Sequence, residues 1–243
     1  MRPGRWIVHQ VGIFAPAIMG LVLGMAPPAA AISFTAVDLN PSGFTSSQAL
    51  GVGGGQQVGY GYTAGNNSHA LLWTGSAGSV VDLSPSGFTS SFAYGVAGGQ
   101  QVGVGFSPAT GGYSHALLWT GTAGSVVDLN PSGFTASEAL GVGGGQQVGY
   151  GSGPATGFLD HALLWTGTAG SVVDLNAFLP PGFTSSDATG IDASGDIVGY
   201  ASDAAGETHA FLWQPVAEPS SVLLLVVGLG ALAGLAWRRG RGI

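Results

Sequence analysis

HALLWTG occupies residues 69–75, and the same seven letters return at 115–121 and 161–167; a fourth version, HAFLWQP, occupies 209–215. The histidines of the four copies are 46, 46 and 48 residues apart. An Asp-Leu pair recurs with nearly the same period. A period of about 46 residues lies in the range of the four-stranded blades of β-propellers. The chain therefore contains four copies of one structural unit.

The sequence pattern of each unit predicts four short strands. In the first unit these are residues 49–52, 58–62, 69–74 and 79–83. Glycines between the first two strands suit a tight hairpin turn, because glycine adopts positive φ at little steric cost. The segment before each histidine differs in length and composition between units. Such variation is typical of an exposed loop.

Side-chain alternation predicts sheets that are covered on both faces. In HALLWT, Ala70 and Leu72 point to one face and Leu71 and Trp73 to the other, so both faces are apolar. Gly59 is expected to leave a smooth surface for a neighbouring sheet. No unit can bury its apolar surface alone, so the units are expected to stack.

The two ends of the repeat array are complementary. Phe34–Leu39 reads as a fourth strand without the first three, and His209–Trp213 as a third strand without a fourth. Pairing of these segments predicts an all-β, four-bladed β-propeller, closed by the N-terminal strand. The alternative is an open β-solenoid, which leaves two unpaired edges.

Charge restricts the partners of this protein. Of 243 residues only 7% are charged, and the five basic residues all lie near the ends, at Arg2, Arg5, Arg238, Arg239 and Arg241. Nucleic acid is excluded as a partner of the repeats, because binding to phosphate needs Lys or Arg. The absence of cysteine excludes disulfides and thiolate metal sites.

Residues 1–31 are predicted to be a signal peptide. Two arginines precede an apolar run from Val11 to Met25, and Ala29-Ala30-Ala31 supplies the small residues of a signal peptidase site. Cleavage is expected after Ala31, following passage through the export machinery. A retained N-terminal anchor is the alternative.

Residues 216–243 are predicted to be a second targeting signal. An apolar run at 222–237 is followed by Arg238, Arg239 and Arg241. As a helix it would span about 24 Å, marginally enough for a bilayer, with the arginines on the cytoplasmic side. Both ends therefore place residues 32–215, the repeat domain, outside the cytoplasm.

This tail resembles the PEP-CTERM sorting signal of exopolysaccharide-producing Gram-negative bacteria. Glu218 and Pro219 match its Pro-Glu-Pro motif, while Ala217 replaces the first proline. The resemblance implies cleavage by an exosortase-type transpeptidase and release to the cell surface or matrix. An ordinary C-terminal membrane anchor is the alternative.

The repeats resemble the bacterial extracellular repeats named HAF after their His-Ala-Phe core. The best match is residues 190–213, and the other three units read His-Ala-Leu. The resemblance covers nearly all of residues 37–213. It implies an extracellular β-rich repeat protein and brings no activity, cofactor or catalytic residue with it.

Three residue patterns invite a chemical role. A metal ring is conceivable in a closed propeller, since imidazole is a common metal ligand; its members would be His69, His115, His161 and His209. Hydrogen bonding to the turn backbone is the simpler role for each histidine. The regular aspartates Asp38, Asp82, Asp128 and Asp174 are expected to accept backbone N–H groups of the following loop. The segment 192–196, DASGD, is expected to form a tight turn, with weak calcium binding as the alternative.

No catalytic residue or cofactor is predicted. The chain contains no nucleophile elbow, zinc-protease motif or phosphate-binding loop. We expect a non-enzymatic structural or interaction protein of the cell envelope or biofilm matrix, with neutral exopolysaccharide contacting exposed tyrosines such as Tyr62 and Tyr113. The alternatives are a secreted glycan-active enzyme and a calcium-dependent adhesin.

Overall fold

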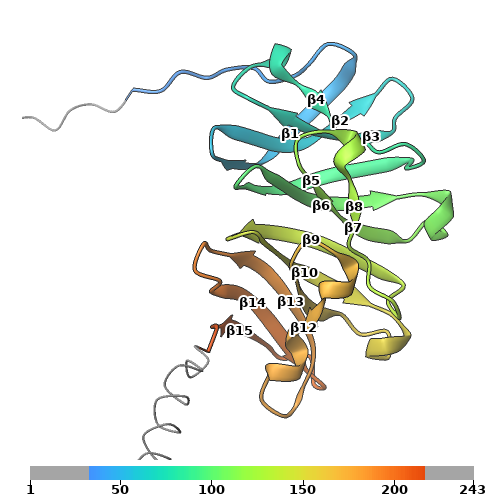
Figure 1. Ribbon diagram of the computed structural model, residues 1–243, viewed down its shortest axis with the longest axis vertical. Coiled ribbons are helices and arrows are strands. Elements are labelled where there is room, and N and C mark those ends of the chain that lie inside the picture. The colour runs from blue at the N-terminus through green and yellow to red at the C-terminus, as the bar shows by residue number, and fades with distance from the viewer. Residues whose placement is uncertain (1–32, 217–243) are drawn as a thin grey trace, which may run out of the picture. The chain divides into compact units, whose positions relative to one another are not determined.

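A computed structural model describes residues 33–216, and this part of the chain is all-β (Figure 1). Contacts divide the chain into two units, up to Ala36 and from Val37 onward; residues 33–36 of the first form no strand or helix. The second unit contains all fifteen strands. The strands are β1 (Phe44–Gly53), β2 (Gln56–Thr63), β3 (Ser68–Trp73), β4 (Val81–Asp82), β5 (Ser90–Ala97), β6 (Gln100–Phe106), β7 (Ser114–Trp119), β8 (Val127–Asp128), β9 (Ala136–Gly143), β10 (Gln146–Ser152), β11 (His161–Trp165), β12 (Val173–Asp174), β13 (Phe183–Ile191), β14 (Ile197–Asp203) and β15 (Thr208–Trp213).

The strands form four antiparallel sheets, one for each repeat. The sheet orders are β1-β2-β3-β4, β5-β6-β7-β8, β9-β10-β11-β12 and β13-β14-β15. In every complete sheet the fourth strand has only two residues, and in the first sheet these pair with Leu71 and Leu72. The predicted repeat of four short strands is thus confirmed for three units, while the fourth sheet has three strands.

The predicted pairing of Phe34–Leu39 with His209–Trp213 is not formed. In the described part of the chain, residues 33–41 contain no strand, and β15 pairs with β14 alone. A fourth strand of this fold contributes only two residue pairs. The two segments belong to opposite ends of the array, with the second and third sheets between them.

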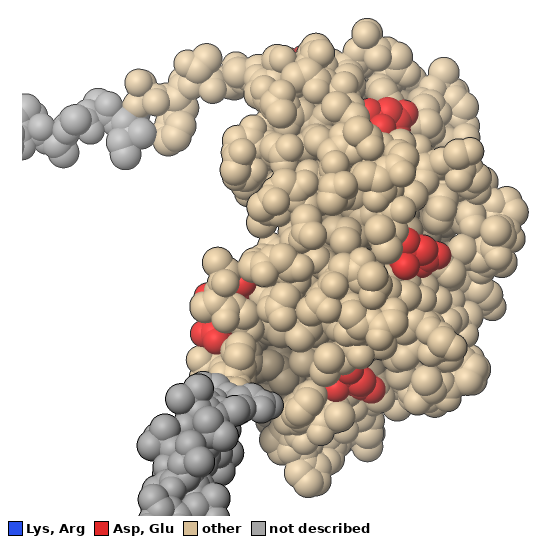
Figure 2. All heavy atoms as spheres, viewed as in Figure 1, with Lys and Arg blue, Asp and Glu red and all other residues tan. Residues whose placement is uncertain are grey.

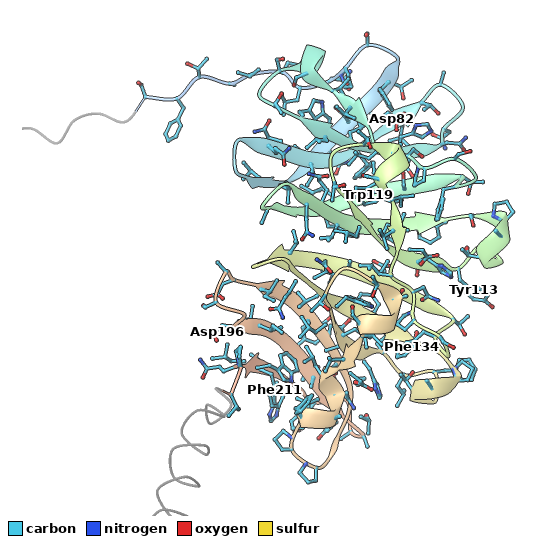
Figure 3. The ribbon with its side chains drawn as sticks, viewed as in Figure 1. Asp82, Tyr113, Trp119, Phe134, Asp196 and Phe211 are labelled. Carbon is cyan, nitrogen blue, oxygen red and sulfur yellow. The ribbon has the colours of Figure 1, made fainter. Side chains whose placement is uncertain are left out.

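Each sheet packs on the next through apolar side chains. We call the side of a sheet that faces the following sheet its forward face, and the opposite side its backward face. Between the first two sheets, Ala70 and Leu72 of the forward face meet Leu117 and Trp119 of the next backward face. Trp119 is wholly buried inside the stack (Figure 3). The predicted alternation of HALLWT is therefore confirmed, since its two sets of side chains cover opposite sheet faces.

The same joint occurs three times. Val58, Val102 and Val148 stand at equivalent forward positions, and all three are buried against the next sheet. The first strands of neighbouring sheets also run close together, so that a Cβ on Gly51 would lie 2.6 Å from the carbonyl oxygen of Tyr94. Figure 1 shows the four sheets following one another in chain order.

The second strand of each sheet requires glycine for a reason internal to that sheet. A Cβ on Gly103 would collide with the backbone oxygen of Phe92 on the adjacent strand. A Cβ on Gly59 would meet the backbone of Gln48 in the same way. The expectation that Gly59 provides a smooth surface for a neighbouring sheet is therefore wrong, because its own sheet occupies the space.

Replacement of Gly103 by alanine is expected to destabilise the protein by about 1–3 kcal/mol, because backbone strands must separate to admit the methyl group. Thermal unfolding of the variant measures this effect. Gly124→Ala is the matched control, since no atom lies within 4 Å of its added Cβ and its φ is not positive. Equal melting temperatures for the two variants would contradict this packing.

Candidate functional site

The repeated histidines and aspartates form one pair in each complete sheet. The histidine is the first or second residue of the third strand and the aspartate ends the two-residue fourth strand, so antiparallel pairing brings them together. The Nδ1 to Oδ2 distance is 2.7 Å in all three pairs. The pairs are His69–Asp82, His115–Asp128 and His161–Asp174. Each histidine is thus held by a carboxylate and not, as expected, by the turn backbone.

The second oxygen of each aspartate holds the loop that leads to the next sheet. Oδ1 of Asp128 accepts the backbone N–H of Asn130 at 2.8 Å, and Asp174 holds Asn176 at 2.9 Å. In the same way, Asp82 accepts the backbone N–H of Ser84, and Asp38 accepts that of Asn40. The predicted role of the four aspartates as acceptors for loop N–H groups is confirmed.

The hydrogen bonds continue across the joint. The Asn130 side chain accepts a bond from the Ser137 hydroxyl at 2.7 Å, and Ser137 in turn accepts the backbone N–H of Ala116, in the preceding sheet, at 3.1 Å. Ser137 is completely buried. The serine-to-alanine bond recurs in the other two joints, from Ala70 to Ser91 and from Ala162 to Ser186. These residues therefore connect neighbouring sheets.

The two ends of the array carry incomplete versions of this network. His209 lies on β15, and among the described residues it has no carboxylate within ion-pair distance. At the other end, Asp38 holds Asn40, and Asn40 accepts the hydroxyl of Ser47 at 2.9 Å. Half of a joint is thus present at each end of the array.

The structure does not assemble a metal ring from the four histidines. Three of them are bonded through Nδ1 to separate carboxylates on separate sheets. Within residues 33–216, no group of three or more His, Asp or Glu side chains is placed to hold one ion.

The DASGD segment forms a tight turn, as predicted. Oδ1 of Asp192 accepts the backbone N–H groups of Ser194 and Asp196, and the Ser194 hydroxyl bonds to the same carboxylate. The hydroxyl of Ser194, followed by these backbone bonds, lowers the pKa of Asp192. The carboxylate is thus occupied by its own turn.

An acidic and tyrosine cluster lies on the third and fourth sheets. Tyr150 stands directly opposite Glu138 across β9 and β10, and Tyr200 opposite Asp187 across β13 and β14. Asp160, in the loop before β11, completes the cluster. Sequence reasoning missed these residues; the signal was that an acid and a tyrosine recur at the same two positions of the third and fourth repeats.

Burial shifts the protonation of this cluster. It raises the pKa of the Glu138 carboxyl, an effect that the Tyr150 hydroxyl partly offsets and that the negative charges of Asp160 and Asp187 reinforce. Burial also raises the pKa of Asp187, with Asp160 adding to the shift. A carboxylate accepts hydrogen bonds, whereas a phenol and a protonated carboxyl also donate them, and this combination suits the hydroxyl groups of a neutral sugar.

The tyrosines named from the sequence have different surroundings. Tyr113 is 55% exposed on the loop before β7, away from the stacked sheets (Figure 3). Tyr62 is half-buried, with its ring edge-on to Tyr60 at 5.5 Å between ring centroids. Tyr113 is therefore the more accessible of the two.

The surface of the described residues has acidic groups and no basic side chain (Figure 2). The acidic atoms form separate groups along the face in view. A phosphate backbone would therefore meet no Lys or Arg on residues 33–216.

The predicted processing residues lie outside the described part of the chain. They are Ala29 and Ala31 of the signal cleavage site, Glu218 and Pro219 of the sorting motif, and Arg238, Arg239 and Arg241 of the tail. The predicted transmembrane segment, 222–237, is outside it as well. Among residues 33–216 the structure contains no helix with the length and apolar character needed to cross a bilayer.

Comparisons with known proteins give no relative. No model of a known protein family matches the chain. No curated protein matches it either.

The His–Asp pair is expected to couple the third and fourth strands by about 0.2–1 kcal/mol, the range measured for exposed pairs of basic side chains with carboxylates. The measurement is a double-mutant cycle of His115→Ala and Asp128→Asn in thermal or denaturant unfolding. Asparagine keeps an oxygen for the N–H of Asn130, so the cycle isolates the bond to His115. A cycle of His115→Ala with Asp174→Asn, from another pair, should give no coupling.

The Glu138→Gln variant is expected to be more stable than the native protein at neutral pH. The pKa of Glu138 is raised in the folded state, so folding favours its protonated form. Its contribution to the free energy of unfolding is then greatest at low pH and falls as the pH rises through the unfolded and then the folded pKa.

Melting temperatures measured from pH 3 to pH 8 test this dependence. The gain from Glu138→Gln should appear as the pH rises and vanish in acid. Glu207→Gln, which removes an exposed carboxylate before β15, should show no such gain. A pH-independent difference between Glu138→Gln and the native protein would contradict the assignment.

Proposed function

We propose that this chain is an exported, non-enzymatic repeat protein with a structural or interaction role in the cell envelope or exopolysaccharide matrix of a Gram-negative bacterium. One observation carries the proposal: the residues that recur in every repeat are used to join strands and sheets. Three of the four histidines bind aspartates, the aspartates hold the connecting loops, and Trp119 and Trp165 lie in the joints. Repeats whose recurring polar residues bond neighbouring strands and loops to one another are typical of a scaffold.

The predicted targeting signals at the two ends of the chain support the proposed location. Residues 1–31 would be removed by signal peptidase, and residues 216–243 would hold the protein in the inner membrane until an exosortase-type enzyme acts near Glu218 and Pro219. The resemblance to PEP-CTERM signals and to HAF repeats supports this assignment. The mature protein would then reach the cell surface or the surrounding matrix.

An open β-solenoid is the architecture that accompanies this role. It was the alternative to a closed propeller, and three like joints between consecutive sheets support it. Such an array offers a long surface for weak, repeated contacts. The cluster of Glu138, Tyr150, Asp160, Asp187 and Tyr200 favours neutral exopolysaccharide as a contact, since its side chains can bond sugar hydroxyls.

Mass spectrometry of the protein from native cells and medium tests the sorting. We expect a chain that begins at Ile32 and has lost the segment after the Ala217–Pro219 motif. The double variant Glu218→Ala, Pro219→Ala should keep its C-terminus and remain in the membrane fraction.

Ala217→Pro is the matched control for this experiment. It restores a full Pro-Glu-Pro motif, so its processing should equal or exceed that of the native chain. A surface protein that still ends at Ile243 would overturn the proposed sorting.

A further inference from the structure

We infer that copies of this chain bind one another head to tail, the N-terminal segment of one copy adding the missing fourth strand beside β15 of the next. Val37–Asp38 of the first copy would take the place that Val81–Asp82 takes beside β3. The backward face of its first sheet would then cover the forward face of the partner's fourth sheet. This inference names a partner for the proposed structural role and rests on that role for its biological meaning.

The three internal joints provide the geometry. In each, a two-residue strand pairs with the third strand of one sheet and leads directly into the first strand of the next sheet. The leucine after the short strand is buried in the joint, as Leu83 and Leu129 are, both with no exposed surface. The N–H of Leu83 bonds to the carbonyl oxygen of Ala70 at 2.8 Å, and Leu129 bonds to Ala116 in the same way.

The two ends of the array expose the two halves of this joint. On the backward side, Val52 is 78% exposed, whereas its equivalents Val96 and Val142 are each 8% exposed. On the forward side of the fourth sheet, Leu212 is 52% exposed, whereas Leu72 and Leu118 are each 4% exposed. Val52 and Leu212 therefore lie at positions that internal sheets bury, whereas Leu71 and Trp73, the first-sheet equivalents of Leu117 and Trp119, have no exposed surface even at the end of the array.

The N-terminal segment already has the conformation of an internal connection. Residues 37–46 read VDLNPSGFTS, against VDLSPSGFTS at 81–90 and VDLNPSGFTA at 127–136. Phe44 N bonds to Pro41 O at 3.3 Å, as Phe88 N bonds to Pro85 O at 3.2 Å. The glycine of this turn has φ of 91° at Gly43 and 89° at Gly87. A segment that is preorganised in this way loses little conformational entropy when it binds.

The polar groups at the two ends are also complementary. Asp38 has its Oδ1 bonded to Asn40, and the internal pattern places its Oδ2 on the Nδ1 of the partner's His209. The hydroxyl of Ser47 would accept the N–H of Ala210, as Ser91 accepts the N–H of Ala70.

A further bond favours this order of the two ends. Within the stack, Gln101 donates to Gln56 at 3.2 Å and Gln147 donates to Gln100 at 3.1 Å. At the junction between copies, Gln57 would donate to Asp196, which stands at the position of Gln56 in the fourth repeat. A carboxylate is a stronger acceptor than an amide oxygen.

A second copy fits these ends better than the chain's own opposite end. The open faces belong to the first and last sheets, which are separated by two intervening sheets in Figure 1. Joining them within one chain would require the described arrangement of the sheets to change. Docking another copy requires no change in the stack, and because the two faces differ, repetition of the contact builds chains of molecules, which form rings where the rotation closes.

Cysteine cross-linking tests the inference, and the cysteine-free chain makes it specific. Val81 and Leu72 are directly opposed across β3 and β4, so Val37 and Leu212 would be opposed across the junction. Opposed positions of antiparallel strands lie within disulfide distance. Val37→Cys and Leu212→Cys are made in separate full-length chains, purified in detergent, mixed and oxidised.

We expect a disulfide-linked dimer that needs both variants in the mixture. Each variant oxidised alone, and Val37→Cys mixed with Tyr113→Cys on a distant exposed loop, should give only background dimer. Both substituted side chains are exposed, at 60% for Val37 and 52% for Leu212, so the fold should persist. The double variant Leu72→Cys, Val81→Cys is the positive control and should form a disulfide within one chain.

A second measurement uses no cysteine. Wild-type protein should sediment as concentration-dependent species larger than the monomer, and Asp38→Asn should weaken this association at least about tenfold, the effect of losing one hydrogen bond to a charged group. Glu207→Gln removes an equal charge near the junction and should leave it unchanged.

Two results would overturn the inference. One is a mixture with no dimer above the Tyr113→Cys background, together with monomeric wild-type protein. The other is a Val37→Cys, Leu212→Cys double variant that forms a disulfide only within one chain, which would mean that the ends close into a ring. Neither result depends on where the protein is sorted in cells, so failure of the head-to-tail contact and failure of the proposed location are distinguishable.

Discussion

Each joint between sheets depends on one aspartate whose two carboxylate oxygens are bonded in different directions. In the second repeat, Oδ2 of Asp128 holds His115 on the third strand, and Oδ1 holds the N–H of Asn130 in the loop. The fourth strand has only two residues and could not fix this geometry by pairing alone. Because the aspartate fixes both the end of one sheet and the start of the connection, the next sheet begins at a defined position.

The apolar contacts follow from that position. Once the connection is fixed, Leu129 lies in the joint and Ser137 accepts a bond from the preceding sheet. Both are within about ten residues of Asp128 along the chain, and the other contacts of a joint come from the two neighbouring repeats alone. Local contacts close small loops at low entropic cost. A chain of this kind can therefore lengthen by repetition without a core that spans the whole molecule.

The sequence predicted the strands well where apolar residues alternate and less well elsewhere. The predicted strand at 69–74 corresponds closely to β3, whereas the first strand, predicted at 49–52, runs from Phe44 to Gly53. The first strands of the sheets begin with polar residues, because Ser91 and its equivalents accept a hydrogen bond from the preceding sheet. In a hydropathy pattern such a polar stretch looks like a loop. The fourth strand was predicted too long, because Ala77–Ser79 forms a 3-10 turn closed by the Ser79 hydroxyl.

The same distinction applies to the recurring polar residues. The bonds from Asp38 and its equivalents to loop N–H groups span two residues, so the sequence was sufficient to predict them. The bond from His69 to Asp82 depends on the pairing of β3 with β4, which periodicity alone does not specify, although the constant separation of thirteen residues was a usable signal. The cluster around Glu138 depends on cross-strand register in the same way.

The sequence predicts that the two ends of the array pair with each other, and within one chain they do not. Repeat arrays usually end in capping units with a polar outer face, because an open end exposes apolar surface and unpaired backbone. Here the first sheet keeps Val52 and the last keeps Leu212, each fully apolar and each exposed. The segment before β1 has the sequence of a fourth strand, and β15 is a third strand without a fourth. The sequence alone does not specify whether two such ends meet within one molecule or between two molecules. The arrangement of the sheets decides that, and within one chain the second and third sheets lie between the first and the last.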